Sequence, residues 1–303
     1  MPKTASKVFG RILLATDGSP GAEMASEVAA QVARGLGSEV TVLCAIPSIS
    51  ALAAPLEGEY YSRLIDKADD AAGKAVAAFK RAGVAVAAKE VPQGKASPVQ
   101  TILDYVEEEK TTLVVMGTRG LGGIKRAVLG SVSSAVTAHA PCASMVVRSD
   151  KKGAPQIKLI LAAVDGSANS QRALEAAVEL AKGVKASLRV AHVVYIPTLF
   201  WSMGIPGSSI PYQRVEDDEA AAGNKVVTQA VKFAKDAGVE DVEEELVTEL
   251  VSPAQGLVQL AKSDHADLIV IGTRGNEGFK KLMMGSVANS VLHYADCSVL
   301  VVK

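Results

Sequence analysis

The sequence predicts an α/β protein built from two tandem domains, each an open, doubly wound, five-stranded parallel sheet with helices on both faces. A chain of 303 residues suits two domains of about 150 residues each. The chain also repeats itself, as a duplicated domain does. Within each copy, short β-branched apolar runs alternate with helical patterns, which is typical of βαβ units around a sheet buried on both faces. A (β/α)₈ barrel is the alternative, but two five-strand copies do not divide into eight strands.

Three segments of the first copy return in the second. They are "RILLATDGSPGAE" (11–23) as "KLILAAVDGSANSQ" (158–171), "LVVMGTRGLGGIKRAVLGSVSSAV" (113–136) as "LIVIGTRGNEGFKKLMMGSVANSV" (268–291), and "PCASMVVR" (141–148) as "DCSVLVVK" (296–303). Equivalent positions lie 148 residues apart at Asp17 and Asp165, and 155 residues apart at Gly117 and Gly272. The second copy therefore carries seven additional residues, which we expect within the proline- and aromatic-rich segment 196–213.

The domain boundaries follow from the repeat. We expect domain 1 over residues 1–149 and domain 2 over residues 156–303. The join, "SDKKGAPQ" (149–156), is polar and contains Gly and Pro, which is typical of a linker.

The elements of the first copy follow in order from local pattern. "RILLAT" (11–16) is an apolar run closed by "DGSPG", which predicts a buried strand. Residues 22–36 place apolar side chains at helical spacing and predict a helix. The remaining elements are expected as strand 39–46, helix 60–82, strand 84–91, helix 97–109, strand 112–118, helix 131–139 and strand 143–148.

Composition narrows the class of protein and its compartment. A net charge of −1 with 49% hydrophobic and 21% charged residues argues against disorder and against a nucleic-acid or membrane partner. The N-terminal segment lacks a signal-peptide apolar region, and no run approaches the ~18–20 apolar residues of a membrane span. Three scattered cysteines without a C-x-x-C pair indicate a reducing compartment, and the four histidines lack metal-like spacing. We therefore expect a cytoplasmic protein without a metal centre of its own.

Candidate functional residues follow the first and fourth strands. Ligands of open α/β sheets bind beyond the carboxyl ends of the strands, where the strand order reverses. The first strand of each copy is followed by "DGS", containing Asp17 and Asp165, and the fourth is followed by "GTRG". A switch point between these two strands would bring both segments together.

The segment "MGTRGLGGIKRAVLGSVSSA" (116–135) is glycine-rich but matches neither the P-loop nor the G-x-G-x-x-G pattern. We expect Gly117 to let a ligand lie against the backbone, and Gly120 to permit a positive-φ turn. Gly130 and Ser131 would open a helix, with serine as a favoured N-cap. The first free amides of that helix, at the positive end of its dipole, would form an anion site that needs no lysine.

The second copy repeats this loop with the same spacing. G-x-x-G, nine residues, then Gly-Ser recurs at Gly272, Gly275, Gly285 and Ser286. Turn and helix-capping duty explains any one of these glycines, but it explains the repeated spacing poorly. Both halves therefore resemble the universal stress protein domain, whose ATP-binding branch is marked by this glycine pattern. The whole chain resembles a tandem universal stress protein, and the likeness includes the "DGS" after the first strand.

The resemblance implies one ATP site in each half, with Mg²⁺ as an optional companion of the nucleotide. The implied contacts are Asp17 and Asp165 on the ribose and metal side, the backbone of Ala45 and Val193 at the adenine, Met116 and Ile271 along the base, and Gly117, Gly120, Gly130, Ser131 and Val132 with Gly272, Gly275, Gly285, Ser286 and Val287 around the phosphates. It also implies strand order 3-2-1-4-5 in each copy and antiparallel pairing of 143–148 with 298–303. The chain would then mimic a dimer internally, and two chains could associate further as a homodimer.

The functional hypotheses are a regulatory nucleotide-binding protein of the stress response and a slow ATPase or phosphotransferase. Efficient phosphoryl transfer needs an in-line nucleophile and cationic clamps, and no general base accompanies Asp17 or Asp165. We therefore expect at most weak ATP hydrolysis and assign no catalytic residue. A flavin-binding or adenylate-transfer relative is a third alternative. Glu277 stands where the first copy has Gly122, and a carboxylate near a triphosphate is unfavourable unless Mg²⁺ intervenes, so the first copy is the better candidate.

Overall fold

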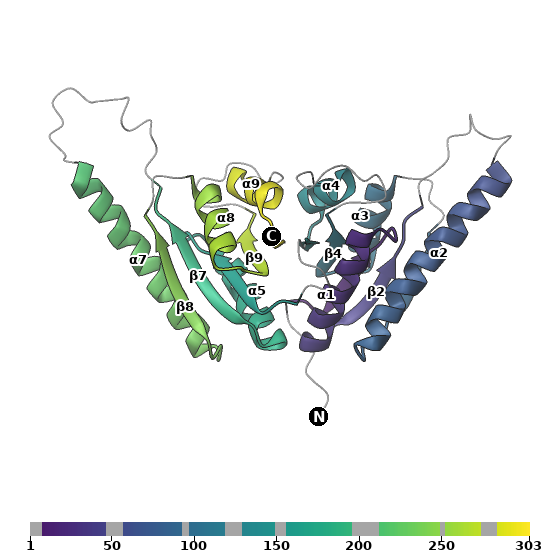
Figure 1. Cartoon of the computed structure of the whole chain (residues 1–303), viewed down its shortest axis with the longest axis horizontal. Coiled ribbons are helices and arrows are strands. Elements are labelled where there is room, and N and C mark those ends of the chain that lie inside the picture. The colour runs from purple at the N-terminus through teal and green to yellow at the C-terminus, as the bar shows by residue number, and fades with distance from the viewer. Residues whose placement is uncertain are drawn as a thin grey trace, which may run out of the picture.

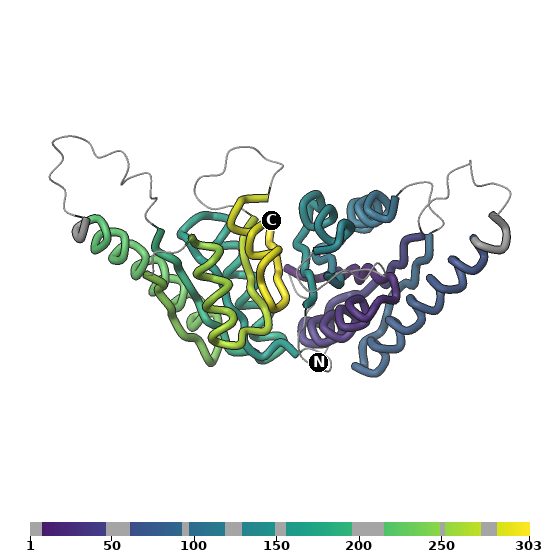
Figure 2. Tube along the Cα trace, turned by 45° about the horizontal axis from the view of Figure 1, so that its top comes forward, coloured from purple at the N-terminus to yellow at the C-terminus, as the bar shows by residue number. Residues whose placement is uncertain are grey.

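The protein forms one ten-stranded sheet with helices on both faces (Figure 1). The computed structural model describes residues 8–46, 57–92, 97–118, 129–148, 156–195, 212–248, 252–273 and 284–303. The two halves lie side by side, and the last strands and helices of each half meet at the centre (Figures 1 and 2).

The described residues of the first half form nine elements in the expected order. They are β1 (Arg11–Ala15), α1 (Pro20–Leu36), β2 (Glu39–Leu43), α2 (Glu57–Arg81), β3 (Ala88–Glu90), α3 (Pro98–Glu108), β4 (Leu113–Gly117), α4 (Ser131–His139) and β5 (Ala143–Val147). The apolar run at 84–91 gives a strand of only three residues, because Val84 and Val86 pack against the core before the chain reaches its pairing partner β2.

The second half repeats this order. Its elements are β6 (Leu159–Ala163), α5 (Ala168–Val184), β7 (Ser187–Val193), α7 (Tyr212–Asp236), β8 (Val242–Val247), α8 (Pro253–Ser263), β9 (Leu268–Gly272), α9 (Ser286–Tyr294) and β10 (Ser298–Val302).

The strand order is β3-β2-β1-β4-β5-β10-β9-β6-β7-β8. Neighbouring strands within each half are parallel, whereas β5 and β10 are antiparallel, with Met145 opposite Leu300. Each half therefore has the order 3-2-1-4-5, and the α/β class is confirmed. One detail differs from two separate parallel sheets: the backbone hydrogen bonds between β5 and β10 join the halves into a single mixed sheet.

Serine caps fix where four of the helices begin. The hydroxyl oxygen of Ser19 accepts a hydrogen bond from the Ala22 backbone N–H, and Pro20 occupies the first helical position of α1. Ser97, Ser167 and Ser252 cap α3, α5 and α8 in the same way. Each side chain satisfies an amide that the helix leaves free, which contributes about 1 kcal/mol.

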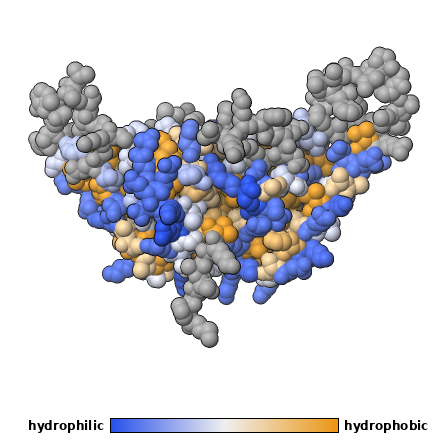
Figure 3. Space-filling model, turned by 180° about the vertical axis from the view of Figure 1, so that it is seen from behind, coloured by the Kyte–Doolittle hydropathy of each residue, from blue (hydrophilic) through white to orange (hydrophobic). Residues whose placement is uncertain are grey.

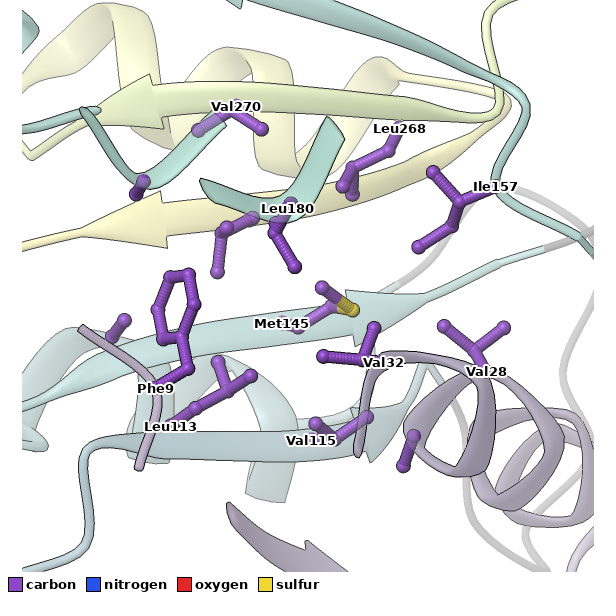
Figure 4. Close-up of a cluster of buried hydrophobic side chains, with 14 of the residues drawn as sticks. Phe9, Val28, Val32, Leu113, Val115, Met145, Ile157, Leu180, Leu268 and Val270 are labelled. Carbon is purple, nitrogen blue, oxygen red and sulfur yellow. The ribbon is translucent and has the colours of Figure 1, made fainter. Parts of the chain in front are cut away.

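The hydrophobic core consists of three clusters. The largest lies under α1, α2, α5 and α7 and runs through both halves. Figure 4 shows Phe9 and Met145 from the first half beside Leu180 and Leu268 from the second. A second cluster lies under α8 and α9, and a third under α3 and α4. Because the largest cluster contains residues of both halves, the two halves share one hydrophobic core.

The described surface is mixed in polarity. Figure 3 shows hydrophilic and hydrophobic residues interspersed on the face seen from behind. The large hydrophobic side chains exposed among the described residues, Val8, Tyr195, Phe233 and Tyr294, are scattered singly, which is ordinary for a folded surface. Within the described part of the chain, no helix is both long enough and apolar enough to span a bilayer.

Candidate functional site

The candidate site of the first half lies at the carboxyl edge of β1 and β4. Ala15 at the end of β1 pairs with Leu43 of β2 and with Met116 of β4. Helices α1 and α2 cover one face, and α3 and α4 cover the other. The chain thus leaves β1 and β4 toward opposite faces, which defines the switch point where ligands of this architecture bind. Asp17 and Gly117 meet at this edge, as expected.

Asp17 stands in a tight turn between β1 and α1. The backbone N–H of Ser19 donates to Asp17 Oδ1 over 3.0 Å. Gly18 has φ +74°, a conformation that favours glycine, and a Cβ on it would lie 2.8 Å from Ala71 Cβ. The Asp17 side chain is exposed at the edge of the sheet. The turn therefore fixes the carboxylate with one of its oxygens already engaged by the backbone.

The second half repeats this turn after β6. The backbone N–H of Ser167 donates to Asp165 Oδ1 over 2.9 Å, and Gly166 has φ +77°. In addition, the Ser170 hydroxyl accepts a hydrogen bond from the Asp165 backbone N–H. The two aspartates are held in the same way, although Asp165 is less exposed than Asp17.

Sequence reasoning missed the residue beside each aspartate, at positions 44 and 192. Burial first, and then the negative charge of Asp17, raise the pKa of the Cys44 thiol to about 11. The equivalent His192 places Nδ1 2.7 Å from the carbonyl oxygen of Val164, next to Asp165. The aligned copies give the only sequence signal, because they place a thiol and an imidazole at the same position near the end of the second strand.

Gly117 has a packing role that the sequence did not suggest. A Cβ at this position would lie 2.6 Å from the backbone carbon of Gly21, in the first turn of α1. The equivalent Gly272 would meet the backbone oxygen of Asn169 at 2.8 Å. The missing side chain thus lets β4 and β9 approach a helix backbone. Contact of either glycine with a nucleotide stays a prediction.

Helix α4 has the expected bounds, but a different residue is its N-cap. Gly130 is the N-cap, with φ −64° and ψ 149°, and Ser131 is the first helical residue. The Gly130 N–H donates to the Thr118 carbonyl oxygen over 2.6 Å, which draws the chain back to the end of β4. The second half repeats this arrangement, with Gly285 as N-cap and its N–H 2.6 Å from the Thr273 carbonyl oxygen. Serine as N-cap is therefore corrected to glycine in both copies.

These two helix starts differ from the serine-capped ones. No side chain caps α4 or α9 within the part of the chain that the structure describes. The first amides of an α-helix have no acceptor within the helix, and the Gly130 hydrogen bond to Thr118 keeps those of Ser131 and Val132 near the end of β4. Ser131 and the equivalent Ser286 are both exposed. The arrangement suits an anion.

The apolar residues implied for the base region gather in each half. Met116 is buried in the cluster under α3 and α4, with Ala45 and Val132 packed against it. Of their counterparts, Ile271 and Val193 are buried in the cluster under α8 and α9, and Val287 packs against that cluster. Each trio thus lies between the end of the second strand, the end of the fourth strand and the start of the last helix.

Several expected site residues lie outside the described residues. They are Gly120 and Gly275 of the G-x-x-G segments, together with Gly122, Glu277 and Trp201. Among the residues that are described, no group of three His, Cys, Asp or Glu side chains could hold a metal ion.

A groove of about 600 Å³ runs between α1 and α2. It starts at Thr16 and Gly18, beside the Asp17 turn, and continues past Ala71 to Arg81. Its lining residues include none from β4 or α4, so it lies beside the candidate site rather than within it.

Comparison with known proteins places this geometry in one family. The model of the universal stress protein family matches residues 9–148 and again residues 156–303. A Mycobacterium tuberculosis universal stress protein is 30% identical over 214 residues, which cover 68% of this chain and 66% of that protein. The chain thus spans just under two thirds of that relative. Another from the same species is 26% identical over 316 residues, covering 96% of this chain and 94% of that protein.

A solved structure supports the fold along the whole chain. The crystal structure of a universal stress protein from Archaeoglobus fulgidus superposes with a TM-score of 0.67 and covers 97% of this chain and 98% of its own. At 20% identity, this likeness concerns the fold alone. Together with the family matches in both halves, it shows that the chain belongs to the universal stress protein family.

Proposed function

We propose that each half binds an adenine nucleotide, ATP, at the carboxyl edge of its first and fourth strands. Occupancy would then favour one conformation or assembly of the protein that partners recognise. The observation that carries the proposal is the duplicated site. Both halves bring an aspartate turn and a helix start without a side-chain cap to one sheet edge, although the helix surfaces of the two copies differ widely.

The chemistry of this edge suits a phosphorylated ligand. The free amides of α4 and α9 and the positive ends of their dipoles attract phosphate oxygens. The apolar trios of the two halves offer a dry surface for a base. Asp17 and Asp165 each engage one carboxylate oxygen with a backbone N–H, and the second oxygen can accept a ribose hydroxyl or hold a Mg²⁺ that accompanies the nucleotide.

The arrangement favours binding over catalysis. In the described part of the chain, His139 and His293 direct Nδ1 at backbone oxygens of their own helices. His192 is engaged with the Val164 carbonyl oxygen. None of these groups stands opposite a helix N-terminus as a base for an attacking water, so we infer that ATP turnover is slow at most.

Two measurements test the proposal. The purified protein is denatured and the released small molecules are identified by mass spectrometry, with adenine nucleotide as the expected result. The melting temperature is then measured with ATP, GTP and inorganic triphosphate, each with and without Mg²⁺. ATP should raise the melting temperature most. If no adenine nucleotide is released and ATP produces no shift, nucleotide binding is refuted, whereas fast Mg²⁺-dependent hydrolysis would favour the enzyme hypothesis.

A further inference from the structure

One basic side chain of each half contacts the last helix of the other half. Arg148, just after β5, donates from its guanidinium to the backbone oxygens of Ala295 and Leu292 at the end of α9. Lys303, just after β10, donates from Nζ to the backbone oxygens of Thr137 (2.8 Å) and Ala138 (3.1 Å) at the end of α4. The contacts are therefore reciprocal.

Arg148 and Lys303 are equivalent in the repeat, and one of the two carbonyl groups that each binds, that of Leu292 or Thr137, is equivalent as well. The final carbonyls of an α-helix lack partners within the helix and carry the negative end of its dipole. A cation there satisfies them and stabilises the helix. The antiparallel β5–β10 pair sends each strand end past the helix of the other half, which is why the cation comes from across the junction.

The helices that Lys303 and Arg148 contact, α4 and α9, are also the helices that begin at the candidate sites. Each has nine residues, or about 14 Å at 1.5 Å per residue, so its two ends move together. At the near end, α4 is tied back by the Gly130 N–H and by the Ser133 hydroxyl, which donates to the Thr118 and Gly130 oxygens. At the far end it depends on Lys303. Leu129, directly before Gly130, packs in the cluster of the second half.

We infer that Arg148 and Lys303 are positioning residues for nucleotide binding, each acting on the site of the opposite half. Lys303 holds α4 at the angle that presents the amides of Ser131 and Val132, and Arg148 does the same for α9. Each nucleotide site is thus completed by the other half of the chain. This inference rests on the proposed function, but its mechanical part concerns the helices alone.

The test exchanges each cation for methionine, which keeps an unbranched apolar stem. Amide hydrogen exchange is measured without nucleotide in the Lys303→Met and Arg148→Met variants. Lys303→Met should speed exchange in α4 about three- to tenfold and leave α9 unchanged, since a cation at a helix end contributes up to this range. Arg148→Met should show the reverse. Lys303→Arg, which places the residue of the first copy in the second, should restore wild-type exchange.

Nucleotide binding is then measured separately in each half, by photolabelling with 8-azido-ATP in competition with ATP, followed by peptide mapping. In Lys303→Met, ATP should protect the first half from photolabelling about three- to tenfold less strongly, whereas protection of the second half should be unchanged. Lys262→Met, which removes an exposed cation 3.8 Å from Asp296, serves as the matched control and should change neither half. Where Arg148→Met does not fold, Arg148→Lys replaces it. We then expect a smaller increase in the rate of amide exchange in α9.

The outcomes separate the two levels of the inference. Unchanged exchange in α4, or equal changes in both helices, overturns the positioning role. An exchange change confined to the opposite half without any change in labelling also overturns it, because the helix would then move without consequence for the site. Absence of ATP-protected labelling in the wild-type protein refutes the proposed function and leaves the exchange pattern to be judged by itself.

Discussion

Gly35 of α1 and Gly183 of α5 occupy equivalent positions in the two copies and touch each other where these helices pack across the junction between the halves. A Cβ on Gly35 would lie 2.6 Å from the Gly183 backbone oxygen. A Cβ on Gly183 would lie 2.4 Å from Leu36 Cδ2. The absence of two side chains thus sets how closely the helices approach, and this contact supports the shared core beneath them.

Gly35→Ala is expected to destabilise the protein by about 1–3 kcal/mol, the cost of forcing a methyl group into a packed contact. The backbone of α5 has to move away, because no flexible side chain can yield. Chemical denaturation measures the change. Gly73→Ala is the matched control, since nothing lies within 4 Å of a Cβ added to this glycine of α2. That variant should gain about 0.5–1 kcal/mol from helix propensity. Equal effects of the two substitutions would contradict the close crossing.

Glu179 and Gln31 are a second equivalent pair at the same junction. Gln31 binds both backbone groups of Ile157, accepting from its N–H over 3.0 Å and donating to its oxygen over 3.2 Å. Glu179 accepts a hydrogen bond from the Val8 backbone N–H, but burial raises the pKa of its carboxyl group. A raised folded-state pKa means that stability from this group is present at low pH and is lost as pH rises through that pKa.

Glu179→Gln should therefore stabilise the protein at pH 7, by less than about 1 kcal/mol because the carboxylate is partly solvated. The difference from wild type should shrink toward zero near pH 4, where the carboxyl group is protonated and resembles an amide. Denaturation curves between pH 4 and pH 7 measure it. The reverse exchange, Gln31→Glu, should destabilise at pH 7 and recover toward pH 4, since a carboxylate would face the Ile157 oxygen. A pH-independent effect of Glu179→Gln would rule out this explanation.

Thr137 and Ser144 carry buried hydroxyl groups for which the described residues provide no hydrogen-bond partner. Both side chains are fully buried, and the second copy has Leu292 and Val299 at these positions. Such a hydroxyl costs about 1–3 kcal/mol of desolvation without a compensating bond. Thr137→Val should therefore raise the free energy of unfolding by about 1 kcal/mol.

Ser38→Ala is the control for this prediction. The Ser38 hydroxyl is also buried, but it donates to the Phe9 backbone oxygen over 2.6 Å. Its removal should destabilise by about 0.5–1.5 kcal/mol. The two substitutions should thus shift the denaturant midpoint in opposite directions, and a loss of stability in Thr137→Val would show that its hydroxyl is satisfied in solution.

The repeat made most of the fold predictable, because apolar runs and "DGS" turns are local signals. The contacts across the junction were not predictable. Gly35 and Gly183 look like ordinary glycines within helices, and only their spatial contact gives them a role. The N-cap of α4 was assigned to Ser131 instead of Gly130 for a similar reason. Serine is the favoured N-cap locally, but the Thr118 carbonyl oxygen captures the Gly130 N–H and decides the boundary.

The helix start also offers a sharp test of the phosphate site. Ser131→Pro removes one backbone N–H at the first helical position, where proline is tolerated. Gly130, with ψ 149°, already has the conformation that a residue before proline requires. The chain itself begins α1, α3 and α8 with Pro20, Pro98 and Pro253. The melting temperature without nucleotide should therefore change little.

ATP affinity of the first half should fall about 10- to 100-fold in Ser131→Pro, because a charge-assisted hydrogen bond contributes about 1.5–3 kcal/mol. Ser131→Ala keeps the amide and removes only the hydroxyl, so its loss should be smaller. Gly117→Ala cannot replace these variants, since its methyl group would push against α1 whether or not a nucleotide binds. Labelling of the second half should be unchanged by Ser131→Pro and weakened by a similar factor in Ser286→Pro. Wild-type affinity in both proline variants would exclude the Ser131 and Ser286 amides as phosphate ligands, because each helix would be intact while that donor was missing.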